Sequence, residues 1–397
     1  MQFNPFDPAF RDDPYPAYAE LRREAPVFRH ETIGFYAVSR YDDVVSVLKQ
    51  PNLFSSKAID LSIDGNPTRT VINTDPPLHT EMRNLVNRAF TPRMVADLEP
   101  RIRQITTELL DAVVAKGETD MVKDLAIPLP VTIIAELLGV DPERRDDFKR
   151  WSNAFVTGDS EDVAQNRAER EATFEQARVY FQEVIDDRRR APRSDLISAL
   201  ARMSGEDPEH LLSPNDLMAF IALLLVAGNE TTTNLIGNAV LALLDHPDEM
   251  ARVRGDTALV PNLVEETLRY DSPVQFLFRT ATEDAEIAGV PVPEGAGVIP
   301  IYASANRDER KYPDPDRFDI TRNTQGHLAF GHGVHFCLGA PLARLEAKVA
   351  LEQVLVRLPD LERRPGPVQR LQGSPFLRGL ATLPLGFTPT PASAAAR

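Results

Sequence analysis

The sequence has a single cysteine, Cys337, among its 397 residues. One cysteine cannot form an internal disulfide bond, and it cannot hold an iron–sulfur cluster, which takes several cysteine thiolates. An unpaired cysteine is typical of a reducing compartment. The chain therefore has no disulfide framework and no cluster of its own for electron transfer, and we expect a cytoplasmic protein.

Long hydrophobic runs are missing as well. The longest, Met218 to Gly228, has 11 residues, whereas a helix needs about 20 to span a bilayer. The first eight residues combine neither a basic stretch nor an apolar one, so no signal peptide is visible. We expect a protein that is not a membrane protein.

The chain has fewer basic than acidic residues. The sequence has 44 Lys and Arg against 59 Asp and Glu, a net charge of −15. Nucleic acids and anionic lipids are bound by basic surfaces, so this balance argues against both as partners. Hydrophobic residues make up 43% of the chain, which is ordinary for a globular protein. The 33 prolines are spread along the sequence, which suits many short connections between helices.

Helical patterns dominate the chain. Apolar residues recur at helical spacing over 98–114 and over 164–190. A further helix is predicted to begin after Ser213, with Pro214 and Asp216 in its first turn, and to end before Pro247. The stretches with strand character are short, and they are 34–38, 285–288, 297–301 and 382–387. The sequence thus predicts a mainly α fold with a small β lobe, in one domain over residues 1–397, with a flexible Pro/Ala-rich tail after about residue 388.

The lone cysteine lies in an unusual segment. Residues 330–339 read Phe-Gly-His-Gly-Val-His-Phe-Cys-Leu-Gly, and the three glycines indicate tight turns or a close approach to a bulky group. Pro341 then opens a strong helix, so Cys337 lies just before a helix N-terminus, where a thiolate is favoured. Such a thiolate can ligate a metal. A zinc site with His332 and His335, or an inert buried cysteine, remains an alternative at this point.

A second unusual segment lies in the helix that begins after Ser213. Ala219 to Ala227 is apolar on every face, so we expect it to be buried on all sides. Glu230 and Thr231 follow directly, and burying a carboxylate is costly unless another group uses it. The Thr231 hydroxyl can bond the Ala227 carbonyl four residues back. The alternative is an ordinary polar turn where the helix reaches the surface.

Several segments together resemble one family. Residues 330–339 are similar at every position to the haem-binding signature of the cytochrome P450 superfamily, Phe-Gly-x-Gly-x-His-x-Cys-x-Gly. Ala-Gly-Asn-Glu-Thr-Thr at 227–232 resembles its oxygen-binding helix motif, and Glu266-Thr267-Leu268-Arg269 resembles its Glu-x-x-Arg pair. The resemblance implies a cytochrome P450 fold that encloses haem b and covers nearly the whole chain, with Cys337 as the ligand of the iron.

The resemblance also implies roles for individual residues. Glu230 and Thr231 would deliver protons, and Glu266 and Arg269 would form a buried structural ion pair, with Arg317 as its third member. The residues expected to bind the cofactor are His79, Arg83, Ala227, Arg279, Phe330, Gly331, His335, Cys337 and Gly339. The residues expected to line the substrate pocket are Leu223, Val274, Gln275, Phe276, Leu277, Phe376 and Leu377.

The activity implied by the resemblance is monooxygenation, in which one oxygen atom of O2 enters a C–H bond of a hydrophobic small molecule. A fatty acid, a terpenoid, a steroid and a macrolide all suit an apolar pocket. No Gly-x-Gly-x-x-Gly follows a strand pattern, so the electrons of NAD(P)H must arrive through a separate ferredoxin-type or flavodoxin-type donor and its reductase. We expect a monomer.

Basic residues near the implied haem site are expected to dock that electron donor; they are Arg83, Arg88, Arg93, Arg344 and Lys348. Two other functions share the cysteine ligand. A haem-thiolate peroxygenase would use H2O2 directly, although related peroxygenases lack the acid–threonine pair. A non-catalytic haem sensor would need no such pair.

Overall fold

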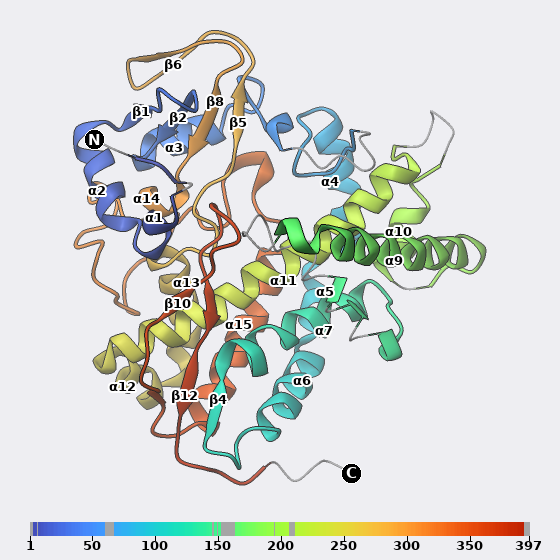
Figure 1. Ribbon diagram of the computed structural model, residues 1–397, viewed down its shortest axis with the longest axis vertical. Helices are drawn as coiled ribbons and strands as arrows, with labels where there is room; N and C mark the ends of the chain where they lie inside the picture. The colour runs from blue at the N-terminus through green and yellow to red at the C-terminus, as the bar shows by residue number, and fades with distance from the viewer. Residues whose placement is uncertain are drawn as a thin grey trace.

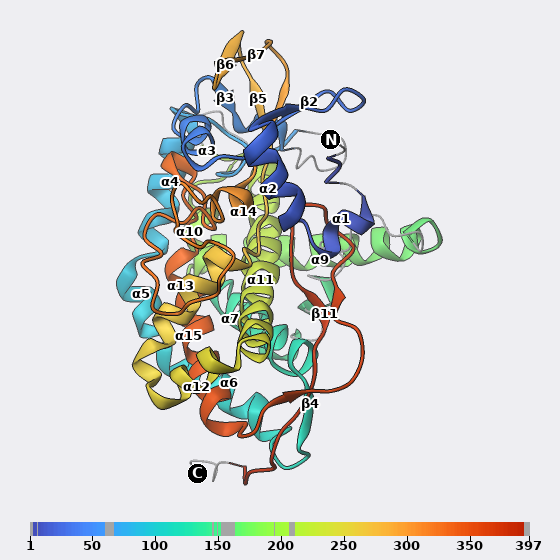
Figure 2. The same ribbon diagram turned by 90° about the vertical axis from the view of Figure 1, so that its left-hand side faces the viewer.

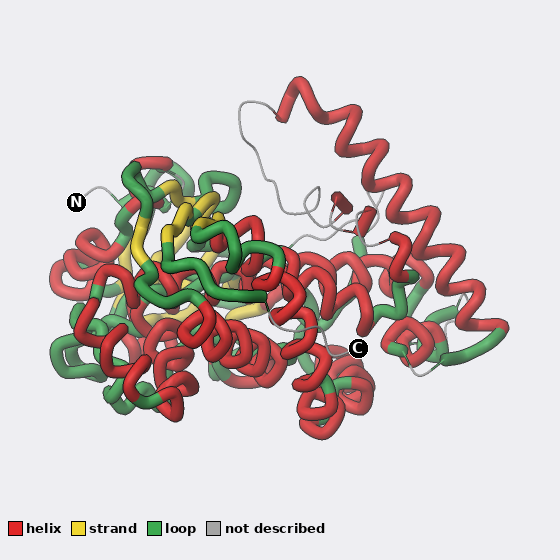
Figure 3. The backbone as a smooth tube through the Cα atoms, turned by 90° about the horizontal axis from the view of Figure 1, so that it is seen from below, coloured by secondary structure: helices red, strands yellow, loops and turns green. Residues whose placement is uncertain are grey.

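The computed structural model describes residues 3–5, 7–59, 67–144, 147–148, 150–151, 163–193, 195–205 and 211–392. Helices dominate, and most strands lie together on one side of the molecule (Figure 3). The helices and helical turns are α1 (Pro8–Asp12), α2 (Tyr15–Glu24), α3 (Tyr41–Leu48), η1 (Ser56–Ala58), α4 (Leu78–Ala89), α5 (Pro92–Asp97), α6 (Glu99–Asp111), η2 (Val122–Ala126), α7 (Pro128–Leu137), η3 (Pro142–Arg144), α9 (Val163–Arg190), α10 (Leu196–Ala201), α11 (Pro214–Asp245), α12 (Pro247–Gly255), η4 (Thr257–Leu259), α13 (Val260–Tyr270), α14 (Tyr302–Ala305), η5 (Gly333–His335) and α15 (Ala340–Arg357).

The strands are short and form four small sheets. They are β1 (Val27–Arg29), β2 (Phe35–Val38), β3 (Phe54–Ser55), β4 (Glu118–Asp120), β5 (Arg279–Ala281), β6 (Ala285–Ile287), β7 (Val290–Val292), β8 (Gly297–Pro300), β9 (Glu362–Arg363), β10 (Gln369–Arg370), β11 (Leu380–Thr382) and β12 (Pro384–Gly386). Each of the four stretches predicted from the sequence contains one of them, namely β2, β6, β8 or β12. The predicted mainly α fold with a small β lobe is confirmed.

The long helix α11 crosses the middle of the molecule and packs against α7, α13 and α15 (Figures 1 and 2). Its start is a capping box: the Ser213 hydroxyl accepts the N–H of Asp216 at 3.1 Å, and the Asp216 carboxylate accepts the N–H of Ser213 at 2.9 Å. The helix ends at Asp245, two residues before Pro247. Both predicted ends are confirmed.

Among the described residues, α11 is also the one helix whose length and apolar composition would suit a membrane span. In this structure, 56% of its most apolar window is buried inside the protein. A central core helix has the same properties as a membrane-spanning one, so these properties agree with its place in the core.

The largest core cluster lies where α6, α11, α13 and α15 meet. Ile102, Ile236, Val264 and Leu351, one from each helix, are each at most 1% exposed. Complete burial of such a side chain contributes about 1.5–3 kcal/mol relative to an exposed one. This packing fixes α11 against α15, the helix that follows Cys337.

The five-stranded sheet has the order β1-β2-β8-β5-β3. Strands β2 and β8 pair in parallel, with Phe35 opposite Gly297, whereas β5 runs antiparallel to both β8 and β3. The sheet therefore brings Arg279, at the start of β5, close to Ser55 at the end of β3. This placement matters for the site described below.

The chain remains hydrogen-bonded beyond the point where a flexible tail was expected. The N–H of Thr388 donates to the carbonyl of Pro359, and the N–H of Thr390 donates to that of Val114. The chain is thus bonded to the rest of the protein as far as Thr390, and the flexibility of the tail after about residue 388 stays a prediction. Residues 393–397 lie outside the described residues.

Candidate active site

The loop before α15 holds Cys337 in a tightly turned backbone. Gly331 and Gly333 have φ angles of +71° and +70°, in the left-handed region that favours glycine. A Cβ atom on Gly333 would lie 2.8 Å from the carbonyl oxygen of Leu48. The N–H of Cys337 donates to the Phe330 carbonyl at 2.9 Å, which closes the loop. The glycines are therefore needed for the turn and for the close approach to α3.

The surroundings of the Cys337 thiol have opposing effects on its pKa. Burial raises the pKa, whereas backbone N–H groups of Gly339 and Ala340 and the charges of Arg83 and Arg344 lower it. The net direction is upward. The helix N-terminus thus acts as the sequence suggests, but burial outweighs it, and the expectation of a thiolate in the protein alone is wrong. A positive charge against the sulfur is needed to favour the thiolate.

His335 in the loop and His327 just before it are engaged with other groups, which argues against a zinc site. The His335 Nε2 lies 2.9 Å from the Ser56 hydroxyl, and the His327 Nε2 lies 3.0 Å from Glu265. The part of the chain that the structure describes contains no group of three His, Cys, Asp or Glu side chains placed to bind a metal ion.

Four basic side chains predicted to bind the cofactor are brought together near this loop. His79 in α4 stacks on His335, with ring centroids 4.3 Å apart. Arg83, one turn along α4, lowers the pKa of His79, and Arg279 lowers that of His335; burial is the larger cause in both cases. The pKa of His335 falls to about 3. Both imidazoles are therefore neutral at pH 7.

These four side chains have few acidic partners. Within the described part of the chain, neither Arg83 nor the buried Arg279 has an ion pair, and neither ring nitrogen of His79 has a hydrogen-bond partner. The nearby carboxylate of Asp75 accepts hydrogen bonds from Ser55 and from the N–H of Ser56 instead. The cluster is thus suited to binding an anion. The sequence analysis missed Ser56 and Asp75, since ordinary polar residues in a loop give no signal.

Ala227, Glu230 and Thr231 lie within about one turn of each other in the middle of α11. The Thr231 hydroxyl donates to the Ala227 carbonyl at 2.8 Å, as predicted. The Glu230 Oε2 is buried and has no partner among the described residues, and burial raises the pKa of this carboxyl to about 8. Glu230 is therefore largely protonated at neutral pH and can serve as a proton donor.

The apolar part of α11 is not buried on every side, contrary to expectation. Ala227 is exposed, and Leu223, Leu224 and Val226 are half-buried. One face of the helix therefore borders open space before Thr231, and the helix does not pack on all sides there. This open face is where a bulky cofactor and a substrate can lie.

Most residues predicted for the substrate pocket lie close together. Val274 pairs with Leu377 across an isolated antiparallel bridge, and the N–H of Gln275 donates to the Phe376 carbonyl at 2.8 Å. Val274, Leu377, Phe376, Leu277 and Leu223 are all half-buried.

Gln275 and Phe276 were predicted to line the substrate pocket, but their side chains point elsewhere. The Gln275 side chain accepts a hydrogen bond from Tyr18 and donates one to the Ser272 carbonyl. Phe276 is fully buried in the aromatic core next to α2, with Phe3 and Tyr18. Both side chains belong to the protein interior, because pairing of this segment with residues 301 and 377 fixes which way each side chain points.

The predicted ion pair is fully buried. Glu266 and Arg269 are both 0% exposed and are joined by two hydrogen bonds of 2.7 and 2.8 Å. Arg269 also donates to the carbonyl of Arg317, but the Arg317 side chain itself is exposed. The guanidinium that approaches Glu266, at 3.4 Å, is that of Arg322. The prediction of Arg317 as the third charged member is therefore wrong.

A second carboxylate beside this pair joins three elements. Glu265 accepts two hydrogen bonds from Arg344 of α15, at 2.6 and 2.9 Å, and lies against His327 in the loop before Cys337. These two partners hold the pKa of Glu265 at about 2, against the effect of its burial. The Arg344 guanidinium lies 4.5 Å from the centre of the Phe330 ring. The sequence analysis missed Glu265, which is adjacent to the predicted Glu266.

Comparison with known proteins decides the family. Residues 131–359, more than half of the chain, match the family described as "Cytochrome P450". The chain belongs to the cytochrome P450 family. Its members include monooxygenases and hydroxylases, and this P450 is accordingly an enzyme of the monooxygenase class.

Individual relatives of this P450 cover almost its whole length. Cytochrome P450 107B1 of Saccharopolyspora erythraea is 43% identical over 96% of each chain. The structure of CYP109Q5 from Chondromyces apiculatus is 46% identical, with a TM-score of 0.89 over 98% of this chain and 99% of that one. CYP109E1 from Bacillus megaterium, in complex with testosterone, is 39% identical, with a TM-score of 0.85 over 96% and 99% of the chains.

The residues of this P450 fit a haem group. The Cys337 sulfur lies at the turn into α15, and the space between it and Gly339 is open. A Cβ atom on Gly339 would lie 4.0 Å from the sulfur. Among the described residues, both ring nitrogens of His79 have no hydrogen-bond partner, and Arg83 and Arg279 form no ion pair, which suits two propionates.

Proposed function

We propose that this P450 binds haem b through Cys337 and inserts one oxygen atom of O2 into a C–H bond of a hydrophobic small molecule. The observation that carries the proposal is the buried Glu230 carboxyl, whose Oε2 has no partner among the described residues, next to Thr231 on the open face of α11. Haem with a thiolate ligand supplies the activation of dioxygen when it is bound.

Several groups of residues would bind different parts of the cofactor. Cys337 would hold the iron, and backbone N–H groups at the start of α15 would donate to its sulfur. His79, Arg83, Arg279 and His335 would bind the propionates, as neutral donors and as cations. Phe330, Gly331, Gly339 and Ala227 would let the protein approach the ring closely from its two faces.

Glu230 and Thr231 would move protons. A carboxyl with a pKa near 8 is protonated at neutral pH and lies close enough to that pH to give its proton and regain one. The Thr231 hydroxyl already donates to the Ala227 carbonyl, which fixes its oxygen in place to accept a proton from Glu230 and pass one on. Removal of either group would therefore interrupt proton supply without removing the substrate pocket.

The substrate would lie against Leu223, Val274, Leu277, Phe376 and Leu377. These side chains are apolar and half-buried, which suits a hydrophobic molecule held by its shape. The testosterone complex of CYP109E1 makes a steroid one of the compounds to test. Fatty acids, terpenoids and macrolides remain equally suitable.

Electrons would come from NAD(P)H through a ferredoxin-type or flavodoxin-type protein and its reductase, which would dock over the Cys337 loop. The expected basic patch is partly neutralised there, because Arg344 pairs with Glu265 and Lys348 with Glu352. The side chain of Arg88 lies outside the described residues. Val334 and Phe336, about 40% exposed on the loop, add apolar contacts for a donor. We further propose a cytoplasmic monomer with one domain over residues 1–397.

One set of spectra and turnovers tests this function. The reduced protein with CO should show the strongly red-shifted Soret band of a thiolate ligand, and Cys337→Ala should lose it. NAD(P)H with a surrogate ferredoxin and reductase should hydroxylate a steroid or fatty acid, and Thr231→Ala should divert electrons to hydrogen peroxide. Product with H2O2 but none with NAD(P)H would instead indicate a peroxygenase. Haem binding without any product across a broad library would indicate a sensor.

A further inference from the structure

A row of polar side chains runs along one face of α11, whose other residues in this half are mostly apolar. Glu230, Asn234 and Asn238 follow at intervals of four residues, and Asp245 lies two turns beyond. With 3.6 residues per turn, this spacing keeps all four within about 80° of the helix surface. The row starts beside Thr231 and ends at the C-terminus of the helix.

The first two members of the row have buried polar atoms without protein partners. Asn234 is 1% exposed, and neither its Oδ1 nor its Nδ2 has a hydrogen-bond partner among the described residues. The same is true of the Glu230 Oε2, one turn earlier. Native proteins satisfy such atoms, commonly with an ordered water that has two to four polar neighbours. Side chains four residues apart on a helix are close enough to share one.

The absence of a side chain at Gly379 leaves room for the Asn234 amide. Gly379 packs against it so closely that a Cβ atom on Gly379 would overlap the amide group. Gly379 directly precedes β11, and it is buried. Position 379 therefore needs a glycine for a polar side chain to lie at position 234.

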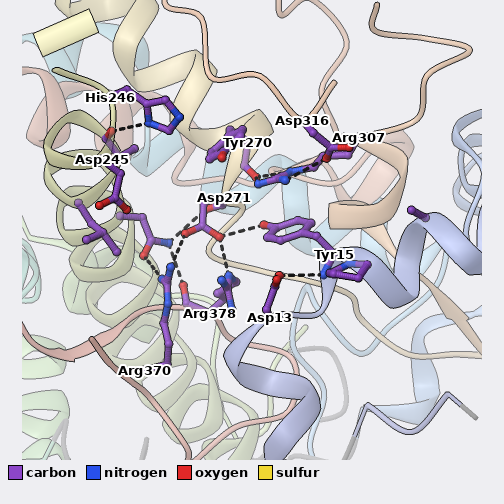
Figure 4. A pocket seen from close by; sticks show the side chains of 15 residues that line it. Asp13, Tyr15, Asp245, His246, Tyr270, Asp271, Arg307, Asp316, Arg370 and Arg378 are labelled. Carbon is purple, nitrogen blue, oxygen red and sulfur yellow. Dashed lines mark hydrogen bonds and ion pairs between the residues drawn. The ribbon is translucent and has the colours of Figure 1, made fainter. Parts of the chain in front are cut away.

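The third member of the row connects it to a cavity near the surface. The Asn238 Nδ2 donates to the carbonyls of Asp271 and Arg378, both at 3.1 Å, and its Oδ1 accepts from Arg370 at 3.0 Å. Asn238 lines a cavity of about 360 Å³ between α2, the end of α11, β10 and the segment before β11. Figure 4 labels Tyr15, Arg370 and Arg378, which also line this cavity. Asp245 also lines it and is exposed, so the cavity reaches solvent.

We propose that Asn234 is a positioning residue that holds a water molecule against the Glu230 carboxyl, and that protons reach this water from the cavity along Asn238. The inference rests on the proposed function, in which Glu230 gives its proton toward Thr231. The Glu230 carboxylate then regains a proton from the water at Asn234. That water takes one in turn from water entering through the cavity, so one O–H bond forms for each that breaks. The amides of Asn234 and Asn238 orient the water and are not themselves protonated.

The water at Glu230 is tested by infrared spectroscopy, which needs no turnover. The C=O stretch of protonated Glu230 is the band that Glu230→Gln removes. Asn234→Leu should move this band to higher frequency, because the carboxyl loses its hydrogen-bond partner, and Asn234→Ser should restore its position in part. Thr232→Val, buried on the opposite face of α11, is the matched control and should leave the band in place. The red-shifted Soret band of the CO complex verifies that the haem site is intact.

The route is tested by coupled turnover in H2O and D2O. Asn234→Leu should lower product formed per NAD(P)H by about tenfold, less than the roughly 10²–10⁴-fold contribution of an acid–base group itself, because Asn234 only positions the water, and it should raise the solvent isotope effect. Asn238→Leu should raise the isotope effect while the Glu230 band stays in place. An unchanged isotope effect in Asn238→Leu would overturn the route to the cavity.

The infrared experiment alone decides whether a water molecule lies between Asn234 and Glu230. An unshifted Glu230 band in Asn234→Leu overturns it, whether or not the wild type makes product. If Asn234→Leu does not fold, Gly379→Ala decides, because a Cβ atom at position 379 would displace the same amide. Absence of NAD(P)H-driven product in the wild type would count against the proposed function alone, since the infrared result stands without it.

Discussion

The imidazole rings of His79 and His335 lie 4.3 Å apart and are tilted by 50° to each other. One comes from the start of α4 and the other from the loop before Cys337, so the contact joins two distant parts of the chain. The pKa of each ring is lowered by burial and by an adjacent arginine, Arg83 for His79 and Arg279 for His335. Two neutral imidazoles and two cations thus lie in the same region.

Arg279→Gln should weaken haem binding. Arg279 is 4% exposed and has no ion pair among the residues described, so its charge is available to a propionate. A hydrogen bond to a charged group contributes about 1.5–3 kcal/mol, which corresponds to roughly a tenfold to hundredfold loss of affinity. Transfer of haem to apomyoglobin measures the change. Arg317→Gln, at an exposed arginine, is the control and should transfer haem at the wild-type rate. Equal rates for both variants would contradict the assignment of Arg279.

Glu266→Gln should destabilise the fold strongly. Removing one charge of a fully buried pair leaves Arg269 charged and unpaired, at a cost of about 3–5 kcal/mol in the free energy of unfolding. Urea denaturation measures it. Glu24→Gln removes a carboxylate from the exposed pair with Arg23 and should cost less than about 1 kcal/mol. A similar small loss in both variants would show that the buried pair is not needed for stability.

Gly333→Ala should destabilise the protein more than a change at another glycine with a similar backbone. At Gly333, φ is +70° and a Cβ would lie 2.8 Å from the Leu48 carbonyl, so both strain and a clash are introduced. Gly34 has φ of +79° but no atom within 4 Å of a Cβ, so Gly34→Ala introduces the strain alone, about 1–2 kcal/mol. Thermal unfolding of the two variants compares them. A melting temperature that falls no further for Gly333→Ala would mean that the loop moves away from α3 without cost.

Glu230→Gln should remove a pH-dependent loss of stability. Burial raises the folded-state pKa of Glu230 to about 8, above its ordinary value of about 4.3 in an unfolded chain. Between these values the folded protein holds a proton that the unfolded chain releases, so wild-type stability falls as pH rises from about 4.3 to about 8. The stability of Glu230→Gln relative to wild type should therefore increase by roughly 3–4 kcal/mol from pH 5 to pH 8.

Urea titrations at the two pH values measure this difference for Glu230. The carboxyl of Glu346 in α15 is also buried, with its pKa raised to about 8, so wild type and variant share its contribution and the difference isolates Glu230. A difference that does not change with pH would place the pKa of Glu230 near its ordinary value.

Features set by neighbours along the chain were predictable from the sequence. The capping box of Ser213 and Asp216 spans three residues, as does the pair of Glu266 and Arg269, and the bond from Thr231 to Ala227 spans four. A helix brings such residues together whatever surrounds it. The segment that carries Cys337 was likewise recognisable, because its glycines determine the turn locally.

Contacts between distant segments were decided by the tertiary structure. Arg322 rather than Arg317 approaches Glu266, and Gln275 and Phe276 point into the core, because the pairing of separate segments sets the direction of each side chain. The protonation of Glu230 and of Cys337 was also decided there, since burial by other parts of the chain raises both pKa values. The sequence alone thus determined the helices, the motifs and the family resemblance. Only folding determined which charges are paired, which are buried, and which are left to bind a cofactor, because these depend on residues far apart in the chain.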